Sequence, residues 1–154
     1  MAWIPLSTDR FKDKLLKSEY DALVAVGLFD GRTWAEVLAD ELLATTRNVR
    51  GYCPPSTARG DGDTIPDELE DQALAIARMK FFTRFVELKK LWSDARNQEY
   101  LQALELLKLW ATNKYHVAPA ATEAPDEEQS AGGGVQLVSS RTINTTQTGL
   151  DGLM

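Results

Sequence analysis

The hydrophobic pattern is clearest between Ile65 and Phe85, where apolar residues recur at helical spacing on two faces. Pro66 suits the first position of a helix, and the acidic residues that follow it suit the positive end of the helix dipole. A helix that is apolar on more than one face is usually buried between neighbours. We therefore expect a core helix from Pro66 to about Leu91. Its first apolar row comprises Leu69, Ala73, Ile76, Ala77, Phe81, Phe85 and Leu88, and its second comprises Ala75, Met79, Phe82 and Val86.

Three further helices are expected before the core helix. Ser7-Thr8-Asp9 and Ser18-Glu19-Tyr20-Asp21 each offer capping residues at the start of a short amphipathic segment. A glycine and the turn Asp30-Gly31-Arg32 end the second segment. Thr33-Trp34-Ala35-Glu36 then matches a capping box, which predicts a longer helix from there to about Arg50.

A loop and a last helix complete the pattern. Residues 52–64 contain two prolines and two glycines and form a loop whose length is often functional. Ser93 or Asp94 is expected to cap a helix from Ala95 to about Asn113. The elements predict an all-α protein, a small bundle of about five helices of which two are short. The expected apolar side of the last helix comprises Tyr100, Leu101, Leu104, Leu107, Trp110 and Ala111.

The composition changes after His116. Residues 117–134 are acidic and rich in alanine and proline, and they end on three glycines, which predicts a flexible linker that cannot fold alone. The segment that follows is dense in strand-forming residues. We therefore expect a helical domain over residues 1–116, the linker over 117–134 and a long extended C-terminal arm over 135–154.

The arm is the expected partner-binding element. An apolar, β-branched segment on a flexible tether can add a strand to the sheet edge of another chain. The apolar residues near the N-terminus are further candidates, because tryptophan is enriched at subunit contacts. The residues expected to contact neighbouring chains are Val135, Gln136, Leu137, Val138, Arg141, Ile143, Leu150 and Leu153 of the arm, together with Trp3 and Ile4.

The charge balance gives no basic footprint for gripping nucleic acid. The chain has 17 Lys and Arg against 23 Asp and Glu, a formal net charge of −6. Its single cysteine rules out an intrachain disulfide, and the N-terminus lacks the basic start of a signal peptide. No apolar run approaches the roughly 20 residues of a membrane span. We expect a soluble protein that is made in the cytoplasm and has no membrane partner.

The sequence presents no convincing catalytic set. The only histidine, His116, lies at the edge of the helical part and is expected at the surface. Cys53 has no second cysteine with which to build a zinc site and is expected to be a buried thiol. The acidic run at Asp61-Gly62-Asp63 departs from a calcium loop, because Ile65 and Pro66 stand at its fifth and sixth positions. We predict no catalytic, cofactor-binding or metal-binding residues.

Arg78, Lys80 and Arg84 form a basic group on the expected core helix. Because acidic residues are plentiful nearby, we interpret this group as a solvated or paired face. Phe81, Phe82, Phe85 and Trp110 are interpreted as core residues, whereas Trp34 and Trp92 are candidates for subunit contacts.

A series of short motifs runs along the chain in a recognisable order. It comprises Thr8-Asp9, Val49-Arg50-Gly51-Tyr52, Thr64-Ile65-Pro66-Asp67-Glu68-Leu69, Ala75-Ile76-Ala77-Arg78, Ser93-Asp94-Ala95-Arg96, Glu99-Tyr100, Ala103-Leu104 and Leu107. The tail from Val135 to Ile143, closing on Gly149-Leu150-Asp151-Gly152-Leu153, completes it. In these motifs the chain resembles the head–tail connector (adaptor) proteins of tailed phages, in particular the group found in Mu-like phages. The resemblance covers most of the chain, while the 52–64 loop and the acidic linker are its own.

The resemblance implies a structural virion protein of the neck, at the head–tail interface. Identical subunits, typically about twelve, would form a ring with heterologous contacts beneath the portal protein. The ring would extend the DNA channel and provide the docking surface for the next neck or tail protein. Genomic DNA would pass through it without sequence readout. The C-terminal arm would reach the portal or a neighbouring subunit and tie the rings together.

Three alternatives remain open at this point. The chain could be another neck component, such as a stopper or tail-completion protein, which the sequence does not separate from a connector. It could be a small helical DNA-binding module such as the small subunit of a packaging enzyme, although that class calls for a basic recognition helix. An enzyme is the third alternative, and the missing catalytic set argues against it.

Overall fold

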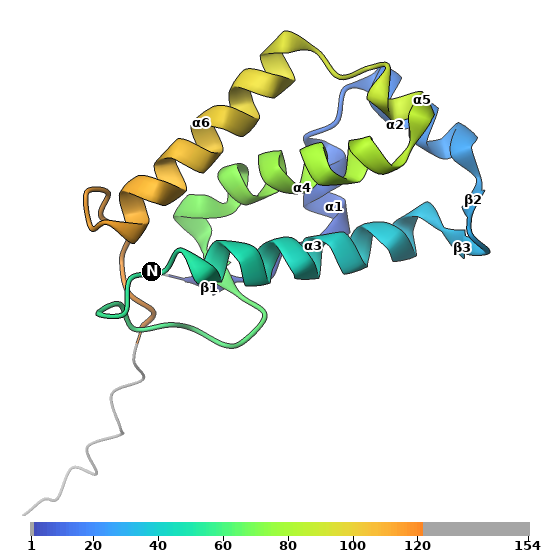
Figure 1. Ribbon diagram of the computed structural model, residues 1–154. Helices are drawn as coiled ribbons and strands as arrows, with labels where there is room; N and C mark the ends of the chain where they lie inside the picture. Colours follow the sequence, from blue (N-terminus) through green and yellow to red (C-terminus); the bar gives the residue numbers. More distant parts are fainter. Residues whose placement is uncertain (1, 122–154) are drawn as a thin grey trace, which may run out of the picture. The chain divides into compact units, whose positions relative to one another are not determined.

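The computed structural model describes residues 2–121, apart from the side chains of Leu28 and Phe29, and this part of the chain is mainly helical (Figure 1). The all-α prediction is therefore confirmed. The elements are β1 (Trp3–Ile4), α1 (Thr8–Asp13), α2 (Lys17–Val26), β2 (Leu28–Phe29), β3 (Arg32–Thr33), α3 (Trp34–Gly51), β4 (Ile65–Pro66), the 3-10 helix η1 (Asp67–Leu69), α4 (Glu70–Arg84), α5 (Val86–Lys89) and α6 (Asp94–Ala111).

Helix α4 is the central element of the bundle. It lies between α3 and α6 and contacts both, as Figure 1 shows. Every residue from 73 to 78 is buried, which is the burial expected for a helix that is apolar on more than one face. The prediction of a core helix in this stretch is confirmed.

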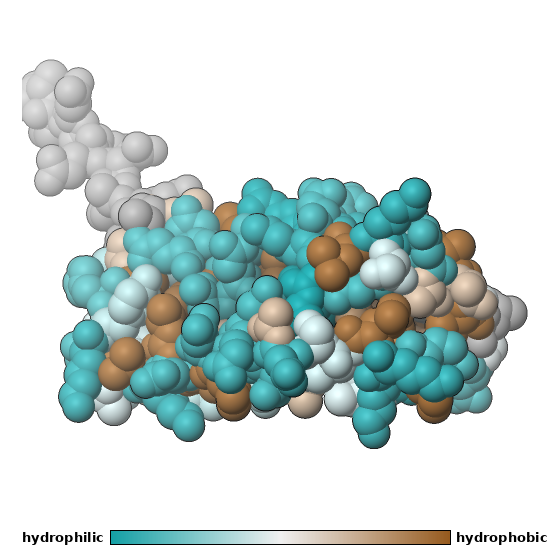
Figure 2. All heavy atoms as spheres, turned by 90° about the horizontal axis from the view of Figure 1, so that it is seen from above, coloured by the Kyte–Doolittle hydropathy of each residue, from teal (hydrophilic) through white to brown (hydrophobic). Residues whose placement is uncertain are grey.

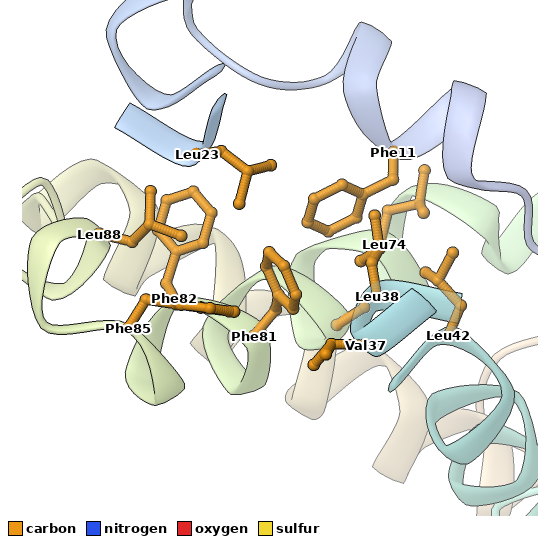
Figure 3. Packing of buried hydrophobic residues seen from close by; sticks show 11 residues of the cluster. Phe11, Leu23, Val37, Leu38, Leu42, Leu74, Phe81, Phe82, Phe85 and Leu88 are labelled. Carbon is orange, nitrogen blue, oxygen red and sulfur yellow. The ribbon is translucent and has the colours of Figure 1, made fainter. Parts of the chain in front are cut away.

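A first hydrophobic cluster surrounds Phe81 and joins the first five helices (Figure 3). The ring of Phe81 meets the ring of Phe11 edge-on, with centroids 5.8 Å apart, and lies 4.9 Å from the ring of Phe85. Aromatic pairs of this kind add about 0.5–1.5 kcal/mol to the contribution of apolar burial. Leu23, Val37, Leu38, Leu42, Leu74, Phe82 and Leu88 complete the labelled set.

A second cluster surrounds Trp110 of α6, which is 1% exposed. It includes Val117, which is 4% exposed, and just beyond it the N–H of Ala120 donates to the carbonyl of Ala58 at 3.1 Å. The chain therefore stays packed on the helices past residue 116, and residues 117–121, which we assigned to the linker, belong to the folded unit. The other buried members are Val49, Cys53, Ile65, Leu69, Ala73, Ala75, Ile76, Ala103 and Leu107.

The capping residues of the two longest helices are those that the sequence predicts. The Thr33 hydroxyl accepts from the Glu36 N–H at 3.3 Å, and the Glu36 carboxylate accepts from the Thr33 N–H at 2.8 Å. This is the capping box of α3. At the start of α6, Ser93 Oγ accepts from the N–H of Arg96 at 3.3 Å.

Two predicted helix starts are wrong. Pro66 is not the first residue of the core helix, because Ile65–Pro66 is held extended by pairing with Trp3–Ile4, and α4 begins only after a 3-10 turn. Ser18 does not cap α2 either. The helix begins at Lys17, and the side chain of Glu19 accepts from the N–H of Leu16 at 2.7 Å.

The core helix is also shorter than predicted. Instead of continuing to about Leu91, α4 ends at Arg84, and Phe85 takes an extended conformation with φ −113° and ψ 120°. A separate short helix, α5, follows. The break lets both Phe85 and Leu88 enter the first cluster, while Val86, which the helical pattern places in an apolar row, is 66% exposed. This additional segment is why residues 2–121 contain six α-helices rather than about five.

Two small antiparallel ladders complete the fold. β2 and β3 are joined by Asp30 and Gly31, whose φ angles of 51° and 74° fit the left-handed turn that an Asp-Gly pair favours. The other ladder pairs Trp3 with Pro66 and Ile4 with Ile65, and it fastens the N-terminus to the start of α4.

Candidate functional site

Trp3 and Ile4, which we expect at partner contacts, are both half-buried in β1. The guanidinium of Arg50 lies over the Trp3 ring, 5.4 Å from its centroid. Gly60 lies so close that a Cβ added there would be 2.7 Å from the Cβ of Trp3. Both residues therefore have a role inside the folded unit, and their contact with another chain stays a prediction.

Arg50 holds the long loop between α3 and β4 in place. Its Nη1 donates to the carbonyls of Asp61 at 2.6 Å and Thr64 at 2.7 Å, and its Nη2 donates to the carbonyl of Gly60 at 3.1 Å. At the other end of the loop, Arg59 donates to the carbonyl of Cys53 at 3.2 Å. The loop is thus fixed to the end of α3 by charged hydrogen bonds, which are stronger than neutral ones.

Four charged side chains from α2, α4 and α6 form one network. Arg96 donates through Nε and Nη2 to the two carboxylate oxygens of Glu19, at 3.0 and 2.8 Å. The Glu99 carboxylate accepts from both Arg96, at 3.0 Å, and Arg78, at 2.7 Å. The side chains of Glu19, Arg78 and Arg96 are only 1%, 6% and 10% exposed. Removing one partner of such a buried pair leaves an uncompensated charge.

Two arginines of the basic group on the core helix pair with carboxylates of two different neighbouring helices. Arg78 is buried and pairs with Glu99 of α6, while Arg84 pairs with the buried Glu41 of α3 at 3.0 Å. The interpretation of these residues as paired is confirmed for both. Arg78, however, does not belong to a surface face.

The pKa values of Arg78 and Arg96 are shifted in opposite directions by burial and by the neighbouring charges. Burial lowers the pKa of Arg78, and the positive charge of Arg96 lowers it further. Burial acts in the same direction on Arg96, but its hydrogen bonds to Glu19 and Glu99 outweigh this effect and raise its pKa. Arg96 is therefore the better compensated cation of the two.

A cleft of about 380 Å³ adjoins this network, between α4 and α6. Arg78, Arg96 and Glu99 provide part of its charged lining, and Lys14 and Asp71, which pair at 2.9 Å, provide the rest. Its apolar lining comprises Leu74, Ala75, Ala103 and Leu106. The charges of the cleft are thus largely paired with one another.

Two polar atoms of this lining remain unused within the part of the chain that the structure describes. Nε of Arg78 and Oε1 of Gln72 are both buried and make no hydrogen bond there. One is a donor and the other an acceptor. Buried polar groups are almost always hydrogen-bonded, so such a pair calls for a partner.

Several large apolar side chains are exposed on the helices. Leu16, at the start of α2, is 58% exposed, and Val24, within the same helix, is 52% exposed. Val86 in α5 is 66% exposed. Leu101 was expected on the buried side of the last helix but is 47% exposed, because α6 packs mainly against α4 and its other faces meet solvent. On the face drawn in Figure 2, apolar residues lie as separate patches among hydrophilic ones.

Two residues considered for chemistry, His116 and Cys53, lie where the sequence predicts. His116 is exposed, and Cys53 is buried with its thiol directed to the carbonyl of Pro54 at 3.7 Å, as the sequence predicts for both. Within residues 2–121, no cluster of three or more His, Cys, Asp or Glu side chains could hold a metal ion. The tryptophans proposed for subunit contacts also have partners: Trp34 meets the Tyr20 ring at 6.5 Å, and Trp92 meets the Phe82 ring at 6.1 Å.

Sequence reasoning missed the charged network. The sequence indicates Glu19 only as a capping residue, Arg96 only as part of a motif, and Glu99 as part of a motif on the solvent-facing side of the last helix. The available signal was the recurrence of Arg and Glu on segments that are otherwise apolar. The eight arm residues expected to bind partners, Val135, Gln136, Leu137, Val138, Arg141, Ile143, Leu150 and Leu153, lie outside the described residues.

No helix in the described part of the chain is both long and apolar enough to cross a membrane. Comparison with known proteins gives no relative: no family model, curated protein or solved structure matches the chain.

Proposed function

We propose that this protein is a structural component of a tailed-phage neck, a head–tail connector whose subunits form a ring beneath the portal protein. The ring would extend the DNA channel and present the docking surface for the next neck or tail protein. Its working location would be the virion, after synthesis in the host cytoplasm. The protein would act as a joint between assemblies and not as a catalyst.

The observation that carries this proposal is the way the connector-like motifs meet in three dimensions. Arg50, from the motif at 49–52, binds carbonyls at both ends of the 60–64 segment, where the next motif begins. Arg78, from the motif at 75–78, pairs with Glu99 of α6, and Glu99 also pairs with Arg96. Residues of these motifs therefore hold parts of one folded unit together.

The surface of the unit supports a role in assembly. Exposed apolar side chains lie on α2 and α5 and, separately, on α6. A ring needs two different surfaces that meet between successive subunits, since heterologous contacts close by rotation. The overall charge of −6 also suits a channel through which DNA must slide, because an acidic wall does not bind phosphates.

The test is electron microscopy of the full chain mixed with the portal ring encoded by the same genome. We expect added density of matching symmetry at the outer face of the portal. Density only below another, already bound ring would favour the stopper or tail-completion role. Absence of binding to the portal, together with tight and salt-sensitive binding to duplex DNA, would replace the proposal with the DNA-binding packaging protein.

A further inference from the structure

We propose that the cleft between α4 and α6 receives a short stretch around Leu137, within residues 135–146 of the C-terminal arm, from a second copy of this chain. The inference rests on the proposed function, because it assigns the contact that would link successive subunits. It concerns the receptor for the arm, which the sequence does not indicate. The occupant is argued from the chemistry of the cleft and from the composition and reach of the arm.

The unused polar atoms match a peptide group. Nε of Arg78 needs an acceptor, and Oε1 of Gln72 needs a donor, and both atoms are buried in the lining of the cleft. A peptide backbone supplies a carbonyl and an N–H within a few ångströms of each other. A stretch of extended chain in the cleft would therefore offer a partner to each atom once the Arg78 and Gln72 side chains turn toward it.

The charges of the cleft favour an uncharged occupant. Lys14 pairs with Asp71, Arg78 pairs with Glu99, and Arg96 pairs with the buried Glu19, so each cation of the cleft already has its own carboxylate. A charged ligand would lose its hydration without gaining a free counter-ion. Residues 135–146 contain a single charged residue, Arg141, whereas the linker before them is acidic.

The apolar lining of the cleft indicates which residue of the arm lies at the centre of the proposed contact. Leu74, Ala103 and Leu106 form an apolar wall beside the polar atoms. With a volume of about 380 Å³, the cleft is near the lower end of binding pockets and holds only a short stretch of chain. Leu137 and Val138 are the consecutive large apolar residues of the segment 135–146. We therefore assign Leu137 to this wall.

The linker is long enough to reach a neighbouring subunit. The 13 residues from 122 to 134 span up to about 45 Å when extended. A folded unit of this size has a radius of gyration of about 14 Å, and hence a diameter of roughly 35 Å. If each copy donates one arm and accepts another, the contact is heterologous and a ring can close.

Disulfide trapping between full-length chains tests the assignment. One chain carries Leu137→Cys and the other Gln102→Cys, since Gln102 lines the cleft and its side chain is exposed. The matched control is Lys108→Cys, which is exposed on the same helix and outside the cleft. The native Cys53 is buried and does not compete. The mixtures are oxidised in the oligomer that the chain forms, free or bound to the portal ring.

We expect the Leu137→Cys and Gln102→Cys chains to cross-link at least about tenfold faster than the control pair, because docking raises the local concentration of the two thiols. Equal rates would overturn the proposal. So would a chain carrying both substitutions that forms only an internal disulfide, because the arm would then fold back on its own cleft. If the chain forms rings on the portal without this cross-link, the arm contact is wrong and the proposed function is still supported. If the cross-link forms without portal binding, the arm contact is supported and the proposed function is not.

Discussion

Arg96 of α6 grips Glu19 of α2 with two parallel hydrogen bonds, from Nε and Nη2 at 3.0 and 2.8 Å, although the two residues are 77 positions apart. Nη2 of Arg96 also donates to the carbonyl of Lys14 at 3.2 Å. This one side chain therefore fixes the α1–α2 corner to the last helix. Because Glu19 is 1% exposed, the pair is a buried ion pair and not a surface salt bridge.

Replacing Arg96 by methionine should lower the free energy of unfolding by roughly 3–5 kcal/mol, because Glu19 keeps a buried charge with no cation. Urea denaturation followed by circular dichroism measures the loss. The double variant Glu19→Leu with Arg96→Met should recover part of it, since two apolar side chains replace the pair. An Arg96→Met protein as stable as the wild type would show that the pair contributes little.

Gly60 should not tolerate even the smallest side chain. A Cβ there would be 2.7 and 2.8 Å from two carbon atoms of Trp3, so Gly60→Ala should cost about 1–3 kcal/mol of stability. Gly62 lies in the same loop, and a Cβ there would meet nothing within 4 Å. Gly62→Ala is therefore the control and should be near neutral in the same denaturation experiment. Equal losses in the two variants would contradict the close packing of Gly60 on Trp3.

Arg50→Lys should loosen the 52–64 loop without unfolding the helices, because an ammonium cannot reproduce the guanidinium fork that binds three carbonyls. Trypsin should then cleave after Arg59 at least about tenfold faster, since a loss of 1.4 kcal/mol in local stability already gives that factor. Arg47→Lys, at an exposed position of the same helix, is the control. Cleavage at an unchanged rate would mean that other contacts hold the loop.

The capping box of α3 should make stability depend on acid pH. The backbone N–H of Thr33, and then its hydroxyl, lower the pKa of Glu36 below its usual 4.5. The carboxylate therefore stabilises the folded state above pH 4.5, and this contribution disappears as the pH falls through the lower, folded-state pKa. The melting temperature of Glu36→Gln should lie below that of the wild type at pH 7, and the gap should shrink near pH 3. A gap that is the same at both pH values would contradict this role.

The helices, and the caps of α3 and α6, could be predicted from local sequence because their causes are local. The Thr33–Glu36 box and the Ser93 cap join residues three positions apart, and the apolar rows of α4 follow from the helical repeat. The break at Phe85 could not be predicted in this way. An unbroken helix satisfies the same repeat, whereas the bend lets Phe85 and Leu88 join the first cluster with residues of α1 and α2.

The charged network could not be predicted from the sequence for a related reason. Glu19, Arg78 and Arg96 look like ordinary surface residues in the sequence, and their burial depends on partners 21 and 77 positions away. The burial of Val117 could not be predicted either, because one apolar residue in an Ala/Pro-rich stretch gives no hydrophobic repeat. The β1–β4 ladder is likewise a contact between two dipeptides, too short for any alternating pattern to appear.

In the proposed function, the C-terminal arm is the element that joins this protein to its neighbours in the neck. The direct measurement compares the full chain with a variant that lacks residues 132–154, by circular dichroism and by co-sedimentation with the portal ring. We predict that the variant keeps the helical spectrum and melting transition but no longer assembles on the portal. Assembly of the shortened chain at the wild-type level would contradict the central claim.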